Sequence, residues 1–184
     1  LAAAYSDAKH YEKARDTYLQ AAEKFNNSER VFYNLGVVYD KLKEYDKAIE
    51  AFRRVIEINP KNAEAYNYIG YTYAERGEKL DEAQELIKKA LQYEQNNGYF
   101  LDSLGWVYYK KGMYFEALKE LLKAIEELEK QNGKGDSVVY EHIGDVYKKK
   151  NETNKAAEYF KKAMEGADAD RRAILEEKLK STVK

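Results

Sequence analysis

The sequence predicts an all-α protein, a right-handed solenoid built from antiparallel helix pairs. The composition is the first reason, because one Pro and ten Gly among 184 residues, with abundant Ala, Glu, Lys and Leu, favour helix along the whole chain. The second is an internal repeat of about 34 residues, a period typical of helical repeat proteins. The third is a pair of apolar stripes at helical spacing within each repeat.

Three residue types recur in step along the chain. The glycines are 34, 35 and 39 residues apart, at Gly36, Gly70, Gly105 and Gly144. The tyrosines are 34, 34, 35 and 39 residues apart, at Tyr5, Tyr39, Tyr73, Tyr108 and Tyr147. The alanines are 34, 35, 34 and 39 residues apart, at Ala14, Ala48, Ala83, Ala117 and Ala156. These intervals place a one-residue insertion within ERGEKLD and a longer one near QNGKGD at 131–136.

Each unit is expected to hold two helices joined by a tight turn. In the unit at 29–62 the apolar residues fall on one face of each helix: Phe32, Leu35 and Tyr39, then Ala48, Phe52 and Val55. Gly36 and Ala48 are small, so the two helices can approach closely. The second helix is expected to end at Asn59, because Pro60 cannot continue it.

The repeat divides the chain into successive units of one continuous domain. Residues 1–28 form a partial unit, and full units follow at 29–62, 63–97, 98–131 and 137–170. Residues 132–136 are expected as an inserted loop. The apolar start at Leu1, without a cap, suggests an array that continues upstream.

Residues 171–184 are expected to form a capping helix, which a solenoid needs over its last apolar face. Asp170 is the expected N-cap of this helix. Its inward-facing residues are expected to be Ile174, Leu175 and Leu179.

The order of residues within each unit resembles the tetratricopeptide repeat. Residues 29–62 carry FYNLGVVY, KAIEAF and NP, and the later units carry YNYIGYTYAERG, LDSLGWVYYKKG and YEHIGDVYKKK. The resemblance implies a superhelix whose concave groove is lined by the first helix of each unit. It also implies a non-enzymatic scaffold that binds a protein or peptide segment.

A narrower likeness lies in the middle of the chain. The phrases RGEKLDEA and LDSLGWVYY resemble the C-terminal repeats of large bacterial tetratricopeptide proteins. These include outer-membrane lipoproteins that act as adaptors for a carboxy-terminal processing protease. The likeness implies an adaptor in a bacterial assembly or proteolysis complex, at a periplasmic or outer-membrane-anchored location. Without it, the cytoplasm is the expected location.

The groove positions of the family hold aromatic residues that the repeat itself does not require. In this sequence they are Tyr33, Tyr71, Tyr99, Trp106 and Tyr109. Tyr and Trp offer large contact area at low entropic cost, so they suit partner binding. Asn67 and Asp102 are expected to orient the partner. Ordinary packing between neighbouring first helices would also account for these aromatics, and the sequence leaves both interpretations open.

The charge of the groove positions indicates the character of the partner. Arg30 is outnumbered there by four acidic residues, Glu64, Asp102, Glu141 and Asp145. This favours a segment that is apolar with some basic character. The Lys and Asn arrangement with which chaperone-binding relatives hold a terminal carboxylate is absent, since its positions hold Tyr33, Val37, Asn67 and Tyr71.

Several other functions find no support in the residues. A net charge of −1 gives no basic face for nucleic acid. The absence of Cys and the presence of only two histidines argue against a metal site. His142 is expected as a packing or surface residue, and no catalytic or cofactor-binding constellation is visible. No apolar run reaches the ~20 residues of a membrane span, so insertion into a membrane is not expected.

Three functional hypotheses follow. The first is the binding scaffold. The second is a structural spacer or self-association segment of a longer repeat protein, with Leu1 to Ala4 at the interface. The third is the non-catalytic end of an enzyme, whose chemistry these residues do not carry.

Overall fold

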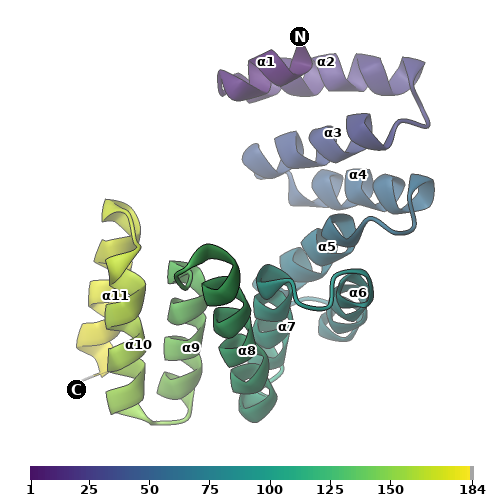
Figure 1. Ribbon diagram of the computed structural model, residues 1–184. Helices are drawn as coiled ribbons and strands as arrows, with labels where there is room; N and C mark the ends of the chain where they lie inside the picture. The colour runs from purple at the N-terminus through teal and green to yellow at the C-terminus, as the bar shows by residue number, and fades with distance from the viewer. Residues whose placement is uncertain (183–184) are drawn as a thin grey trace.

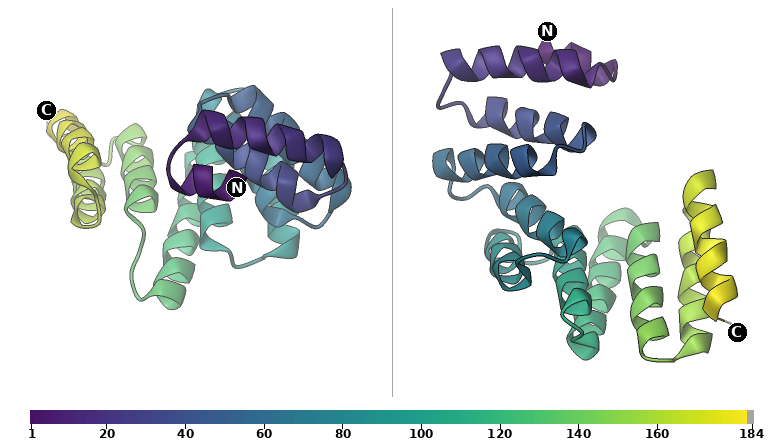
Figure 2. Two further views of the ribbon diagram at one scale, coloured as in Figure 1. Left: turned by 90° about the horizontal axis from the view of Figure 1, so that it is seen from above. Right: turned by 180° about the vertical axis from the view of Figure 1, so that it is seen from behind.

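The computed structural model describes residues 1–182, and these form helices joined by short turns. The helices are α1 (Ala2–Asp7), α2 (Tyr11–Lys24), α3 (Glu29–Lys41), α4 (Tyr45–Ile58), α5 (Ala63–Arg76), α6 (Leu80–Tyr93), α7 (Gly98–Lys110), α8 (Tyr114–Asn132), α9 (Ser137–Lys149), α10 (Thr153–Glu165) and α11 (Ala169–Thr182). Successive helices pack antiparallel and the pairs stack into the expected right-handed α-solenoid (Figure 1). The stack turns along its length, so that α1–α4 lie across the direction of α8–α11 (Figure 2).

Helices α3, α5, α7 and α9 are the first helices of successive pairs. They begin at the first residues of the four predicted full units, 29, 63, 98 and 137. Polar side chains fix three of these starts: Asn62 accepts a hydrogen bond from the Ala65 amide at 2.8 Å, and Asn97 and Asp136 cap α7 and α9 in the same manner. The helix starts are therefore encoded locally.

The repeating glycines and alanines lie where the two helices of a pair touch. Ala48, Ala83, Ala117 and Ala156 are all fully buried. A Cβ added at Gly70 would lie 2.8 Å from the carbonyl oxygen of Ala83, which is closer than real side chains allow. The close approach of α5 and α6 thus depends on a hydrogen atom in place of a side chain.

The core runs along the array rather than forming one centre. Each apolar cluster is shared between neighbouring pairs, and its largest fully buried side chains include Phe52, Ile69, Ile87, Leu121, Leu128 and Phe160. Contacts between successive pairs are what hold such an array together, because no single pair can bury its own apolar face.

Three expectations about the C-terminal third differ from the structure. Helix α8 runs through Asn132, so the connection comprises residues 133–136 rather than 132–136, because the insertion mostly lengthens the helix. Helix α11 begins at Ala169, and Asp168, not Asp170, accepts the hydrogen bond from the amide of Arg171 at 2.9 Å.

The capping helix is also less apolar in its contacts than expected. Leu175 is fully buried, but Ile174 is 54% exposed and therefore does not face inward. The expected segment 171–184 includes two residues, 183 and 184, that lie outside the described part of the chain.

Candidate functional site

Neighbouring first helices are joined by hydrogen bonds from an aromatic ring to a carboxylate. The hydroxyl of Tyr33 on α3 donates to Oε2 of Glu64 on α5 at 2.6 Å. The hydroxyl of Tyr68 on α5 donates to Oδ1 of Asp40 on α3 at 2.7 Å. Further along, Nε1 of Trp106 on α7 donates to Glu75 on α5. A charged acceptor strengthens each bond, so these pairs fix how each unit sits on the next.

A similar contact, with an imidazole in place of the phenol, links the first helices α7 and α9. Nδ1 of His142 on α9 lies 2.8 Å from Oδ1 of Asp102 on α7, and both side chains are buried. Burial by itself lowers the pKa of His142, but the charge and hydrogen bond of Asp102, with the charges of Asp145 and Glu141, outweigh it and raise the pKa overall. His142 is thus a packing residue, as the sequence suggested.

Trp106 lies inside a stack of three rings. Its ring centroid is 4.6 Å from that of Tyr109 and 4.0 Å from that of His142, with interplanar angles of 12° and 16°. Lys110 places its ammonium 5.0 Å from the same indole centroid. Because Trp106 is only 8% exposed, its indole belongs to the packing between units and offers little free surface.

The residues predicted for the groove therefore fall into different settings. Trp106 and Asp102 are buried, Tyr33, Asn67, Tyr71 and Tyr109 are half-buried, and Tyr99 is 53% exposed. Asp102 and Trp106 both contact His142, and Tyr109 stacks on Trp106. Tyr33 instead packs edge-on against Phe52, with ring centroids 5.4 Å apart. Oδ1 of Asn67 is buried and has no hydrogen-bond partner among the described residues.

Charges from four helices act on Tyr71 in the middle of the array. Burial raises the pKa of its hydroxyl, and the carboxylates of Glu75, Asp102 and Glu141 raise it further, whereas Arg171 on α11 lowers it. Charged side chains of α5, α7, α9 and α11 therefore lie close enough to Tyr71 to act on its hydroxyl.

A pocket of about 500 Å³ lies beside Tyr71, and we call it the Tyr71 pocket. Its lining residues come from α3, α5 and the start of α4: Asp40, Tyr45, Tyr68, Tyr71, Thr72, Glu75 and Arg76. Arg76 is engaged by Asp46 at 2.5 Å and by Glu78 at 3.2 Å. The pocket thus combines three aromatic rings with two carboxylates, and its one cation is already paired.

The acidic residues of the groove are largely occupied within the chain. Glu64 accepts from Tyr33 and Asp102 pairs with His142. Glu141 and Asp145 both pair with Lys178 on α11, at 2.7 and 2.5 Å. In this structure a basic partner would therefore have to compete with donors of the chain itself for these four residues.

The sequence did not reveal the carboxylates that matter most for the pocket, Asp40 and Glu75. One signal was available: Tyr33–Glu64 and Glu75–Trp106 are both separated by 31 residues. This recurring aromatic–acid spacing, close to one repeat, indicates contact between neighbouring first helices.

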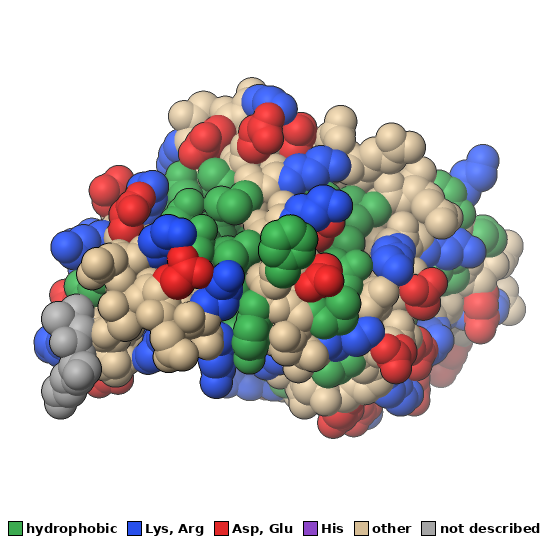
Figure 3. Space-filling model, turned by 90° about the horizontal axis from the view of Figure 1, so that it is seen from below, with side chains coloured by type: hydrophobic (Ala, Val, Ile, Leu, Met, Phe, Trp, Pro, Cys, Tyr) green, Lys and Arg blue, Asp and Glu red, His purple; other side chains and the backbone are tan. Residues whose placement is uncertain are grey.

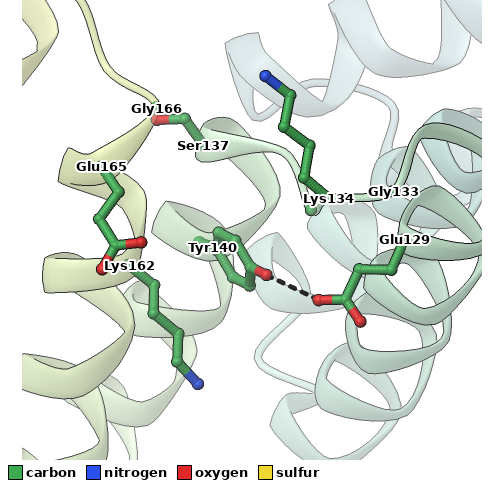
Figure 4. A pocket seen from close by; sticks show the side chains of 9 residues that line it. Glu129, Gly133, Lys134, Ser137, Tyr140, Lys162, Glu165 and Gly166 are labelled. Carbon is green, nitrogen blue, oxygen red and sulfur yellow. Dashed lines mark hydrogen bonds between the residues drawn. The ribbon is translucent and has the colours of Figure 1, made fainter.

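A second pocket, of about 440 Å³, lies where α8 ends, α9 begins and α10 ends (Figure 4). The hydroxyl of Tyr140 crosses it to donate to Oε1 of Glu129 at 2.9 Å. Lys134 and Lys162 line it together with Glu129 and Glu165, so its charges are mixed. Figure 3 shows similar mixing on the face seen from below, where apolar side chains lie among Lys, Arg, Asp and Glu.

Two kinds of site are missing from residues 1–182. No group of His, Asp or Glu side chains in this part of the chain is arranged to hold a metal ion. None of the described helices is long and apolar enough to cross a membrane.

Comparisons with known proteins give the same family for different parts of the chain. Models of the tetratricopeptide repeat match residues 29–62, 51–85 and 138–165. A "TPR repeat-containing protein" of Methanocaldococcus jannaschii is 35% identical over 74 residues, which cover 40% of this chain and 13% of that protein.

Solved structures share the fold over nearly the whole chain. PilW, a "widely conserved type IV pilus biogenesis factor", has a TM-score of 0.81 at 24% identity, covering 100% of this chain and 83% of PilW. TTC0263, a tetratricopeptide protein of Thermus thermophilus, has a TM-score of 0.76 at 17% identity, covering 100% and 95%. These matches show that the chain has the tetratricopeptide fold, and the repeat models with the curated relative show that it is a tetratricopeptide repeat protein.

Proposed function

We propose that the protein is a scaffold that binds an apolar protein segment with a basic side chain in the Tyr71 pocket. Tetratricopeptide proteins typically bind other proteins and are typically not enzymes. The pocket carries the proposal, because Tyr45, Tyr68 and Tyr71 offer aromatic walls while Asp40 and Glu75 offer acceptors. Aromatic anchors beside a polar rim are typical of sites that dominate binding energy.

The partner's charge follows from the free acceptors of the pocket. Arg76 is paired with Asp46 and Glu78, so it does not neutralise the two carboxylates. Trp106 donates to only one oxygen of Glu75, and Oδ2 of Asp40 is approached only by the exposed Lys41, at 3.6 Å, so both carboxylates can accept from a Lys or Arg of the partner. An adaptor role in a bacterial assembly or proteolysis complex is consistent with this chemistry and belongs to the same proposal.

Site-specific cross-linking tests this proposal. A photoreactive benzoylphenylalanine replaces Tyr71 in one variant and Phe115 in a matched control, since Phe115 is an aromatic residue on α8 that is 77% exposed. Adducts with a partner protein are expected from position 71 and not from position 115. Equal adducts from both positions, or none from position 71, would contradict binding in the pocket.

Melting of Tyr71→Ser separates binding from packing. A variant that melts within a few degrees of the wild type but gives no complex supports a binding role for the ring. A collapse of the melting temperature would show that Tyr71 acts mainly in packing between units.

The N-terminal end of the array favours self-association as a second function. Leu1, Leu19 and Phe25 are 84%, 40% and 61% exposed. Leu1 also lines a pocket of about 200 Å³, together with Ala2, Ala3, Tyr18, Arg30, Val31 and Asn34. Light scattering across a range of concentrations tests this function, and Phe25→Ser is expected to lower the apparent mass. A mass that stays monomeric at every concentration would exclude self-association.

A further inference from the structure

Helix α11 buries few of its side chains. Only Leu175 and Thr182 of this helix are buried, and Ile174 is 54% exposed. The preceding helix, α10, buries Ala156, Phe160 and Ala163 completely. Burial of a single large apolar side chain provides about 1.5–3 kcal/mol. Polar contacts therefore contribute much of the specificity with which α11 is placed.

Those contacts include three ion pairs between α11 and α9, besides hydrogen bonds from Lys148 to Ser181 and from Arg172 to the carbonyl oxygen of Met164. Nη2 of Arg171 lies 2.6 Å from Oε2 of Glu141. Nζ of Lys178 lies 2.7 Å from Oε1 of Glu141 and 2.5 Å from Oδ2 of Asp145. The two carboxylates are one helical turn apart on α9 and the two cations are two turns apart on α11, so each pair shares one face of its helix.

The carboxylates need a cation from outside their own unit. The side chains of Glu141 and Asp145 are only 11% and 12% exposed, so each would be costly to leave unpaired. Burial opposes ionisation of Glu141, yet Lys178 and Arg171 hold its pKa below the ordinary value. Any helix that replaced α11 would therefore have to supply positive charge.

The fit of α11 is incomplete. Nε of Arg171 is buried without a hydrogen-bond partner among the described residues. A guanidinium has five N–H donors, and an unpaired buried donor costs free energy. A second helix with better-placed cations could thus bind the same carboxylates more favourably.

We propose that Glu141 and Asp145 form a binding site for a basic partner helix with two cationic side chains seven residues apart, and that α11 is its internal occupant. The partner displaces α11 and places its own cations on the two carboxylates. This site is at the C-terminal end of the array, on residues that do not line the Tyr71 pocket, although the charges of Glu141 and Arg171 act on the hydroxyl of Tyr71. The proposal does not rest on the function proposed above.

Peptide binding to the full chain tests the site. The probe is a fluorescent synthetic peptide of residues 167–182, and a second peptide carries alanine at the positions of Arg171 and Lys178. The first peptide is expected to bind the variant R171A/K178A at least tenfold more tightly than the wild type, because the internal cations no longer compete. Binding is expected to weaken as salt rises, and the second peptide is expected not to bind.

The matched control is K161A/K180A, which removes the same charge from exposed positions on α10 and α11. It is expected to bind the peptide no better than the wild type. A folded R171A/K178A that binds neither peptide, or binds both equally, would overturn the proposal.

Hydrogen exchange of the unmodified protein gives a second, independent readout. Amides of α11 are expected to exchange faster than those of α9 and α10, and the difference is expected to grow with salt. If the amides of α11 are as well protected as those of α10 at high salt, the proposal that a partner displaces α11 is overturned. Light scattering would detect dimers that exchange α11 between two copies. Such dimers would show that the occupant of the site is a second copy of the chain, and would overturn the proposal of a partner helix.

Discussion

The imidazole of His142 on α9 and the carboxylate of Asp102 on α7 form a buried pair, with Nδ1 and Oδ1 2.8 Å apart. The side chains of these two residues join successive units directly across their first helices. Trp106, 4.0 Å from His142 between ring centroids, covers the pair. This contact is the most deeply buried of the bonds that fix one unit on the next.

The His142 pair is expected to make stability depend on pH. The pKa of His142 is raised in the folded chain, so its contribution is complete below the unfolded value of about 6.5 and is lost as pH rises through the folded pKa. His142→Gln is expected to lose about 2 kcal/mol at low pH and less at high pH. Urea unfolding at a series of pH values measures the free energy of unfolding of the wild type and of the variant.

His10→Gln is the matched control, because His10 is the other histidine and is exposed. Its curve is expected to follow the wild type. The indole of Trp106 provides a spectroscopic check, since it is the only Trp and stacks on the imidazole. If the free energies of unfolding of the wild type and of His142→Gln change with pH in parallel, the pH dependence cannot be assigned to His142.

Two neighbouring leucines of α8 are expected to differ sharply in their effect on stability. Leu121 is fully buried and Leu122 is 40% exposed. Leu121→Ala is expected to cost about 2–5 kcal/mol through lost burial and a cavity, and Leu122→Ala about 0.5 kcal/mol. Denaturant unfolding compares the two, and equal losses would show that the register of α8 is wrong.

Gly70→Ala is expected to destabilise the array although alanine favours helix. The new methyl group would lie 2.6 Å from Cγ1 of Ile87 and 2.8 Å from the carbonyl oxygen of Ala83. Overpacking of this kind costs about 1–3 kcal/mol. Gly166→Ala is the control, because the nearest atom to its methyl group would be Cβ of Ser137 at 3.5 Å. Thermal melting that ranks Gly166→Ala below Gly70→Ala would contradict the packing of α5 on α6.

Several tyrosines are expected to resist ionisation until the protein unfolds at high pH. Burial is the main cause that raises the pKa of Tyr33, Tyr68 and Tyr71, and it raises that of Tyr109 to about 12. Stability is therefore complete below the unfolded value of about 10 and falls as pH rises above it. Phenolate absorbance and circular dichroism, followed together, should show one joint transition. Ionisation of these rings in a chain that stays fully helical would contradict their burial.

Much of the fold was predictable because its signals are local or periodic. The recurring glycines predicted the helix pairs. The predicted units begin where helices begin in the structure, at Glu29, Ala63, Gly98 and Ser137. Side-chain caps such as Asn62 act within three residues. The cap of α11 was misplaced because Asp168 and Asp170 suit the role equally in sequence, and only backbone geometry distinguishes them.

The candidate site was less predictable because its properties depend on neighbours one repeat away. The groove position of Trp106 was read from the repeat, but its burial depends on Tyr109, His142 and Glu75 closing around it. Glu141 and Asp145 looked available for a partner, yet α11 places Arg171 and Lys178 on them.

The sequence alone determined the helical class, the period and the small residues at each helix crossing, since these follow from backbone propensity and from spacing along one helix. Only the tertiary structure decided which groove residues are free. That outcome depends on how side chains from adjacent units share one buried space, and a ring such as that of Trp106 can occupy it only once its neighbours are in place.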